Sequence, residues 1–258
     1  MNLYQKLNWL FKMGADESVG EAPVNRFQKK ASVPARKPES AVSATPSYDT
    51  KDDIALHQAM ALADSAQTLG DLYHALNSFD ASSLKRTAMH TVFAKGTPEA
   101  SVMFIGDVPD GDDDKQGIPY AGESSVLLDK MLAAIDLSLS DNAYVAMLVP
   151  WRPPGNRKPT PAEIAVSLPF IKKHIELVSP DVLVLFGGLT AGALLGIDSI
   201  SKARSAWQKY QSETDASPID CLVTFSPAFL LKNAAYKRHA WEDLQKLQRK
   251  LNGESQTR

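Results

Sequence analysis

Apolar and polar residues follow two distinct patterns along the chain from about residue 52 onward. Uninterrupted apolar runs predict buried strands over residues 101–106, 143–149, 181–186 and 221–225. Apolar residues at helical spacing predict helices over residues 52–79, 123–136, 160–178, 189–195 and 235–251. Buried strands that alternate with helices form a parallel sheet with both faces covered. The sequence therefore predicts an α/β fold, a three-layer α/β/α sandwich with a central parallel sheet.

The pattern changes toward both ends of the chain. Residues 1–19 begin with leucines and a phenylalanine on one face of a short helix, and residues 20–51 carry prolines and polar residues without any apolar period. The second stretch predicts a disordered linker, followed by a folded domain over residues 52–252 and a tail over residues 253–258. The N-terminal helix docks a protein partner, lies on a membrane surface or packs on its own domain, and its low charge favours the last.

Composition narrows the compartment and the class of site. The chain has 258 residues, of which 44% are hydrophobic, and no apolar run approaches the ~18 residues of a membrane span. The first residues lack the apolar core of a secretory signal, so we expect a cytoplasmic protein without a membrane segment. Cys221 is the single cysteine, which excludes an intrachain disulfide and an all-cysteine zinc or iron–sulfur site. With a net charge of -2, nucleic-acid binding requires a local basic patch.

In a parallel sheet, ligands bind at the carboxyl ends of the strands, so the loops after the predicted strands are the places to search. The loop after Ile105 holds five aspartates within eight residues. Their spacing does not match a calcium loop, because the twelfth position counted from Asp110 is Ala121 rather than glutamate. A solvated acidic loop is therefore favoured over a metal site, and no metal is expected.

Two further loops carry positive charge. The basic loop, residues 150–159, holds three cations and no acid, and it suits either a phosphate backbone or plain solvation. The 226–233 loop has an apolar tip followed by Lys232, with Lys237 and Arg238 beyond it. This tip is either a wedge inserted into a nucleic-acid duplex or the start of the core face of the last helix, and the residues alone favour the core.

Taken together, the three loops resemble the uracil-DNA glycosylase superfamily, specifically its family-four type and an alphaproteobacterial-like branch. That family's first motif, Gly-Glu-x-Pro-Gly, an acidic stretch and then Gly-x-Pro-Phe-x-Gly, is similar to residues 106–122. Its Arg-Pro-Pro-x-Asn-Arg-x-Pro motif is similar to residues 152–159, and its His-Pro-Ser/Ala-Tyr-Leu-Leu-Arg motif to residues 226–232. The resemblance covers nearly the whole predicted domain.

This resemblance implies an enzyme that flips uracil out of DNA and hydrolyses its glycosidic bond in base excision repair. It implies two catalytic positions, Asp107 and Ser226. It implies a base pocket of Gly106, Val108, Pro109, Tyr120 and Met147, with Tyr120 as the stacking residue. It implies DNA contacts from Arg152, Asn156, Arg157, Lys158, Pro227, Ala228, Phe229, Leu230 and Lys232.

Three of these positions depart from the family pattern. Asp107 stands where the family has glutamate, Met147 where it has the asparagine that reads the uracil edge, and Ser226 where it has histidine. A thioether donates no hydrogen bond, and a serine hydroxyl reaches less far than an imidazole. Removing one preorganised donor costs about 10²–10³-fold in rate, so we expect uracil excision to be weak or altered.

The family usually holds a [4Fe–4S] cluster on four cysteines. The expected cysteine positions fall near Ser83, at Trp151 and at Ser167, and Cys221 matches none of them. The cluster is expected to be absent, with its site filled by Trp151 and apolar neighbours.

These observations leave three hypotheses. The first is a DNA glycosylase of family-four type, and the second is a non-catalytic DNA-binding or regulatory relative that has lost the activity. The third, a nucleotide-binding α/β protein of unrelated function, has only the generic fold behind it. DNA is the expected partner, no cofactor is expected, and we expect a monomer.

Overall fold

The computed structural model describes residues 50–197, 199–212 and 217–253. The predictions for residues 1–19, nearly all of 20–51 and all but the first residue of the tail lie outside these ranges. Within them, no helix is both long enough and apolar enough to cross a membrane.

The described residues form a six-stranded sheet in the order β1-β3-β2-β4-β6-β5. The strands are β1 (Ala94–Gly96), β2 (Val102–Gly106), β3 (Ala143–Met147), β4 (Val182–Phe186), β5 (Gln208–Tyr210) and β6 (Ile219–Thr224). The central strands β3, β2, β4 and β6 are parallel, which confirms the predicted parallel sheet. The edge strands β1 and β5 pair antiparallel and were not predicted, because three-residue strands carry no readable period.

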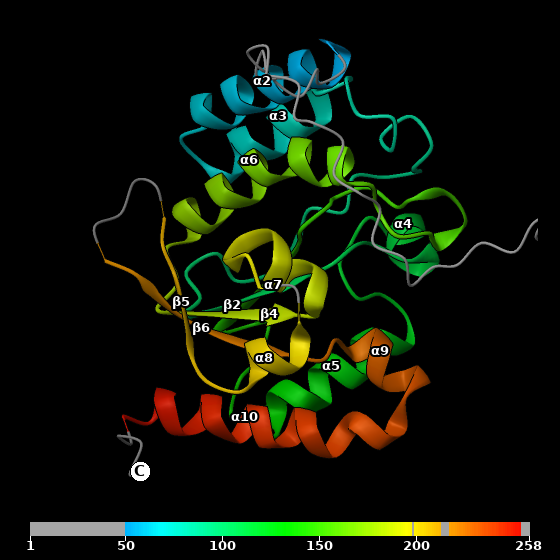
Figure 1. The fold of residues 1–258 in the computed structure, drawn as a ribbon. Coiled ribbons are helices and arrows are strands. Elements are labelled where there is room, and N and C mark those ends of the chain that lie inside the picture. The colour runs from blue at the N-terminus through cyan, green and yellow to red at the C-terminus, as the bar shows by residue number, and fades with distance from the viewer. Residues whose placement is uncertain (1–49, 198, 213–216, 254–258) are drawn as a thin grey trace, which may run out of the picture. The chain divides into compact units, whose positions relative to one another are not determined.

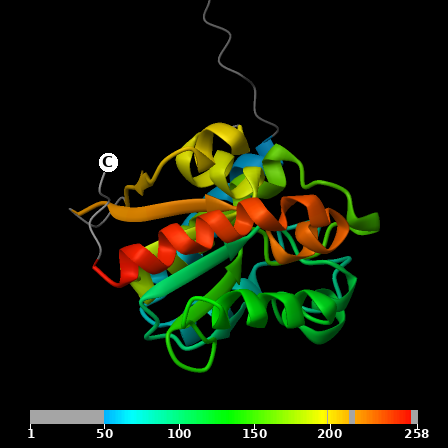
Figure 2. The same ribbon diagram turned by 90° about the horizontal axis from the view of Figure 1, so that it is seen from below.

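Helices cover both faces of the sheet (Figure 1). One face carries α2 (Thr50–Ser65), α3 (Leu69–Ser78), α6 (Pro161–Val178) and α7 (Gly188–Leu195). The other carries α5 (Glu123–Ala133), α9 (Pro227–Lys232) and α10 (Lys237–Leu251). Figure 2, seen from this second side, shows α10 lying across the sheet. The short α4 (Gly111–Gln116), α8 (Ile200–Arg204), and the 3-10 turns at Pro154–Asn156 and Ala234–Tyr236 complete the described elements. The three-layer sandwich is confirmed.

Two helix predictions differ in an instructive way. The predicted helix over residues 52–79 is two helices, because Thr68 caps α3 and its hydroxyl accepts from Asp71 N at 3.1 Å. The predicted start of α6 is confirmed: Thr160 and Glu163 form a reciprocal capping box with proline at the first turn. The cap at Thr68 lies inside a continuous apolar pattern and was missed. The cap at Thr160 precedes its apolar pattern and was recognised.

The acidic stretch is not a solvated loop, and this prediction was wrong. Residues 111–116 form α4, capped by Asp110, and the side chains of Asp113 and Asp114 are buried. Asp113 accepts from Ala121 N at 2.6 Å, and Asp114 accepts from Met89 N at 2.8 Å. Asp113 therefore holds the segment at Tyr120 and Asp114 holds the turn at Met89, each by satisfying backbone N–H groups.

Candidate active site

A cavity of about 310 Å³ opens at the carboxyl edge of the sheet, beside the ends of β2, β4 and β6. Its lining residues are Asp107, Gly187, Gly188, Ile200, Ser201, Phe225, Ser226, Phe229 and Tyr236. The structure thus brings together the two predicted catalytic residues, Asp107 and Ser226, although they lie far apart in the sequence. Crossover connections cause this meeting, because parallel strands present their carboxyl ends at one edge.

Asp107 follows β2 directly and has a defined orientation. Its Oδ1 accepts a hydrogen bond from Thr190 N at 3.0 Å. A Cβ on Gly187, whose φ is 115°, would lie 2.7 Å from Asp107 Oδ2, so glycine is required there. Loss of hydration raises the pKa of Asp107 to about 6, and the Thr190 hydrogen bonds and the charge of Lys158 oppose this rise. Its carboxylate is therefore both ionised at neutral pH and able to take up a proton.

Ser226 is the N-cap of α9. Its Oγ accepts from Phe229 N at 3.2 Å, as a capping serine does. A hydroxyl has one proton to donate and lone pairs to accept, so this arrangement leaves the Ser226 proton for a group in the cavity.

The predicted base-pocket residues Gly106, Tyr120 and Met147 lie together. Gly106 and Met147 are register partners at the ends of β2 and β3. A Cβ on Gly106 would collide with the Tyr120 hydroxyl and the Met147 sulfur, so only glycine lets these three pack. Tyr120 is buried at φ 51°, a conformation that is costly for an aromatic residue, and its ring meets Phe186 edge-on at 5.6 Å. Burial, with the nearby Asp107 charge, raises the pKa of the Tyr120 phenol well above its usual value.

None of the five predicted base-pocket residues is among the residues that line the cavity, and the remaining two are Val108 and Pro109. Pro109 is buried, and Val108 packs against the apolar core on the α6 side. Val149 N donates to Asp107 O at 3.2 Å and Leu148 N to Gly106 O at 2.7 Å, so the backbone of this turn continues the β2–β3 ladder. Val108 and Pro109 therefore fix the path of the turn that carries Asp107.

The 226–233 loop divides its side chains between the core and the surface. Pro227 and Leu230 are buried, whereas Phe229 is 37% and Leu231 40% exposed. Ala228 is partly buried, and Lys232 is exposed. Part of the apolar tip is therefore packed in the core, and the role of its exposed residues as a wedge stays a prediction.

Most cations of the basic loop are tied to nearby acceptors. Arg157 donates from both terminal nitrogens to Glu163, at 2.8 and 2.6 Å, and Arg152 Nε donates to Asn156 Oδ1 at 2.7 Å. Arg152 also lies 3.8 Å from Asp114. Lys158 is exposed and forms no ion pair with any residue in the described ranges, and its charge acts on Asp107.

Comparison with known proteins agrees with this arrangement. Residues 93–245, more than half of the chain, match the family model described as the uracil DNA glycosylase superfamily. The chain belongs to this superfamily. Among its similar relatives, the type-4 uracil-DNA glycosylase of Thermotoga maritima is 32% identical over 173 residues, which span 63% of this chain and 83% of the relative. The type-4 uracil-DNA glycosylase of Archaeoglobus fulgidus is 27% identical over 184 residues, 70% and 92% of the two chains. The family-four assignment is thereby confirmed.

The four-cysteine cluster of the family does not fit this superfamily member. Its one cysteine, Cys221, is buried in β6, where burial raises the pKa of the thiol well above its usual value. At the expected ligand positions, Ser83 Oγ lies 3.5 Å from Glu163 Oε1, and Ser167 Oγ donates to Glu163 O at 2.9 Å. Trp151 is buried against Phe79, with ring centroids 6.1 Å apart. In the described ranges, no three His, Cys, Asp or Glu side chains are arranged to hold a metal ion.

Sequence reasoning missed part of the cavity wall of this glycosylase-superfamily protein. Phe225 and Tyr236 form the aromatic side of the cavity with Phe229, and Gly187 and Thr190 hold Asp107. The Gly187-Gly188 pair directly after a predicted strand was the available signal. The partner of that glycine, Asp107, is remote in the chain and only the fold reveals it.

Proposed function

We propose that this protein is a uracil-DNA glycosylase of the type-4 kind, which binds DNA and excises uracil in base excision repair. The observation that carries the proposal is the cavity that joins Asp107 and Ser226 at the carboxyl edge of the sheet. A cavity of about 310 Å³ has room for a pyrimidine ring and an attacking water. The names and motifs of the relatives supply the reaction, and the residues of this chain supply the groups that perform it.

In the proposed reaction, a nucleotide rotates out of the DNA strand and its base enters the cavity. Water attacks C1′ of the deoxyribose while the bond from C1′ to the base nitrogen breaks. The Asp107 carboxylate takes the proton of the water, and the base leaves with the bonding electrons as an anion that is later protonated. Because its pKa is near 6, Asp107 is suited to this proton transfer at neutral pH.

Ser226 serves the departing base. Its hydroxyl proton is not used by the α9 cap, so it can donate to a carbonyl oxygen of the base as negative charge develops there. Phe225, Phe229 and Tyr236 provide the aromatic wall of the cavity. At the position that the resemblance assigns to the base edge, Met147 offers only a weak acceptor. We therefore expect slow excision with reduced discrimination between pyrimidines.

The DNA strand is proposed to lie along the exposed cations on the two sides of the cavity. Lys158 approaches from the basic loop and Lys232 from the 226–233 loop, and both are exposed. Lysines in such positions neutralise phosphates and release counterions, which makes binding sensitive to salt. Phe229 and Leu231 are half-exposed, and in this proposal they fill the gap that a flipped nucleotide leaves.

A uracil-excision assay tests this proposal directly. Purified protein is incubated in excess with single- and double-stranded oligonucleotides that carry one uracil, and abasic sites are measured after alkaline cleavage. We expect slow release by the natural protein and a loss of about 10²–10⁴-fold in Asp107→Asn. Asp112→Asn is the matched control, because Asp112 is an exposed aspartate on the neighbouring α4 and should leave the rate unchanged.

A second variant reports on the pocket itself. Met147→Asn with Ser226→His restores the donors that the resemblance assigns to these positions, so we expect faster excision than in the natural protein. No release by either protein from any of the substrates would overturn the proposal. DNA binding without release would instead identify a non-catalytic relative.

A further inference from the structure

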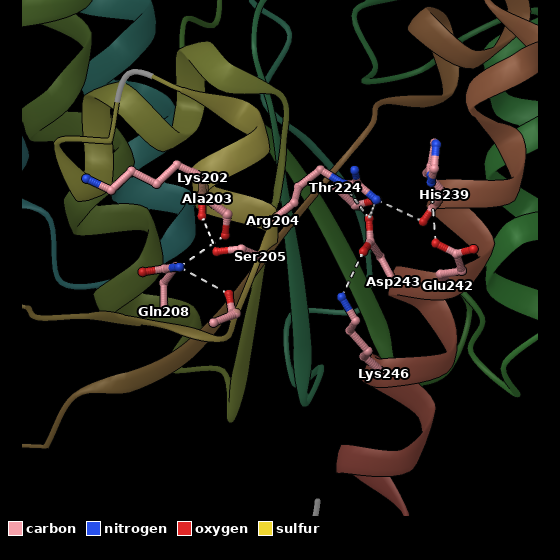
Figure 3. Close-up of polar contacts among 11 residues, drawn as sticks. Lys202, Ala203, Arg204, Ser205, Gln208, Thr224, His239, Glu242, Asp243 and Lys246 are labelled. Atoms are coloured by element: carbon pink, nitrogen blue, oxygen red, sulfur yellow. Dashed lines mark hydrogen bonds and ion pairs between the residues drawn. The ribbon is translucent and has the colours of Figure 1, made fainter. Parts of the chain in front are cut away.

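A buried ion pair joins Arg204, at the end of α8, to Asp243 of α10 (Figure 3). Asp243 of α10 is fully buried, and its Oδ2 accepts from Arg204 Nε at 2.7 Å and from Thr224 Oγ1 at 2.8 Å. Lys246 Nζ lies 3.4 Å from the other carboxylate oxygen. None of these residues lines the cavity, and neither the motifs nor the proposed reaction assigns them a part.

Arg204 connects three elements through one side chain. It comes from the end of α8, donates through Nη2 to His239 O at 3.0 Å, and pairs with Asp243 on the next turn of α10. Its Cζ also lies 4.4 Å from the centre of the Phe225 ring, just beyond the end of β6. A planar guanidinium can donate in its plane and stack on a ring at the same time, which an ammonium cannot.

Phe225 connects Arg204 to the cavity, because its ring lines the cavity and contacts two other aromatic rings there. Its ring stacks on Phe229 with centroids 5.2 Å apart and an interplanar angle of 15°, and it meets Tyr236 at 5.0 Å. Phe225 also immediately precedes Ser226, the residue proposed to donate to the leaving base. A shift of the Phe225 ring would therefore move both the aromatic wall and the hydroxyl.

We propose that Arg204 and Asp243 are positioning residues that fix Phe225, and through it Ser226 and Phe229, at the edge of the cavity. The role in catalysis rests on the proposed function, whereas the constraint on the 226–233 loop does not. A buried ion pair is an expensive way to stabilise a fold, because desolvation offsets much of its attraction. Unlike an apolar pair, the ion pair has directional hydrogen bonds, and these hold Arg204 in one orientation over the Phe225 ring.

Hydrogen exchange measures the constraint without any activity. The amides of Phe229, Leu230 and Asn233 donate within the 226–233 loop, to Ser226 Oγ, Ser226 O and Phe229 O. In Asp243→Asn, Arg204 loses its charge partner, and we expect these amides to exchange about tenfold faster, as local opening becomes easier. Exchange at the natural rate would overturn the proposal.

Asp220→Asn is the matched control. Asp220 lies on the same strand β6, at the end away from the cavity, and it accepts from Lys209 at 2.6 Å and Lys250 at 2.7 Å. Asp220→Asn also removes an ion pair between β6 and α10, but it does not alter the contacts of Phe225. If the 226–233 loop of this control exchanged as fast as that of Asp243→Asn, Arg204 and Asp243 would contribute only to overall stability, and the positioning role would be refuted.

Arg204→Lys separates positioning from charge. Lysine keeps an ion pair with Asp243 but cannot stack on Phe225 and bond His239 O together, so we expect loosened exchange in a protein that still folds. In single-turnover excision at saturating protein, we expect the rate to fall about tenfold while the DNA dissociation constant changes less than about twofold. An unchanged rate with loosened exchange would refute the catalytic role, and no excision even by the natural protein would refute the proposed function but not the constraint.

Discussion

The basic loop and the 226–233 loop look alike in the sequence and differ in the structure. Both follow a buried parallel strand, and both present cations to the same edge of the sheet. In the basic loop, Arg152 and Arg157 are held by Asn156, Asp114 and Glu163, and only Lys158 extends freely among the described residues. In the 226–233 loop, Lys232 is exposed and no described ion pair holds it, while the backbone is anchored by buried Pro227 and Leu230.

This difference shows that the number of cations in a loop does not give the number of phosphates that the loop can bind. A guanidinium whose two terminal nitrogens already meet a carboxylate has little left to offer a phosphate, and it instead shapes its own loop. Glu163 accepts from Arg157, closes the cap of α6 and lies beside Ser83. The basic loop is therefore held in place by polar contacts, and the 226–233 loop by apolar burial. Four predictions sharpen this contrast.

The largest effect is expected on stability, from Glu163→Ala. This change breaks the capping box of α6 and leaves Arg157 without its partner, so we expect the free energy of unfolding to fall by about 2 kcal/mol. Urea unfolding measures it. Glu123→Ala is the control, because Glu123 is an exposed glutamate in the first turn of α5 and should change stability by less than about 0.5 kcal/mol. Equal losses in the two variants would mean that Arg157 is not anchored by Glu163.

The second prediction concerns Asp107, which the basic loop approaches through Lys158. The pKa of Asp107 is about 6 in the native state, whereas its ordinary value is 3.8. Between these two pH values the native state therefore binds more protons than the unfolded state. Stability contributed by this group is therefore lost as pH rises through that window. We expect Asp107→Asn to be more stable than the natural protein by about 1–2 kcal/mol at pH 7.5, with no difference near pH 3.5. A difference that does not vary with pH would contradict the raised pKa.

The third prediction compares DNA binding by the two loops. Neutralising Lys232 or Lys158 should weaken binding severalfold and reduce the slope of log affinity against log salt by about 0.7–0.9 each. Arg157→Gln should leave the slope nearly unchanged, because its guanidinium is already paired with Glu163. Fluorescence anisotropy with a labelled oligonucleotide at several salt concentrations provides the measurement. A full slope change in Arg157→Gln would show that its ion pair opens to bind phosphate.

The smallest effect is a shift in the pH profile of excision. The rate should rise with pH through the pKa of Asp107, since the ionised carboxylate accepts the proton. Removing the positive charge in Lys158→Gln disfavours the ionised form of Asp107, so this limb should move to higher pH, and added salt should reduce the shift. Lys232→Gln is expected to leave the limb in place. A shift to lower pH in Lys158→Gln would contradict the sign of this interaction.

Local signals account for what was predicted correctly. The apolar strands, the cap at Thr160 and the ordered motifs each depend on neighbouring residues, so the parallel sheet and the family could be read from the chain. The acidic stretch misled, because aspartates that cap a helix and bind remote N–H groups look the same in sequence as solvated ones. Of the residues that line the cavity, the sequence named Asp107, Ser226 and Phe229, and it did not name Phe225 or Tyr236.

By itself, the sequence determined the four central strands, the main helices and the edge of the sheet at which the motif loops lie, since hydrophobic period and caps act over a few residues. It also determined the lack of cluster ligands, because a chain with one cysteine cannot supply four. Only the tertiary structure decided which cations are paired. Arg157 forms an ion pair with Glu163 and Arg204 with Asp243, whereas Lys158 and Lys232 are exposed. Such pairing depends on which surfaces pack together, and burial in turn raises the pKa of Asp107 in the cavity.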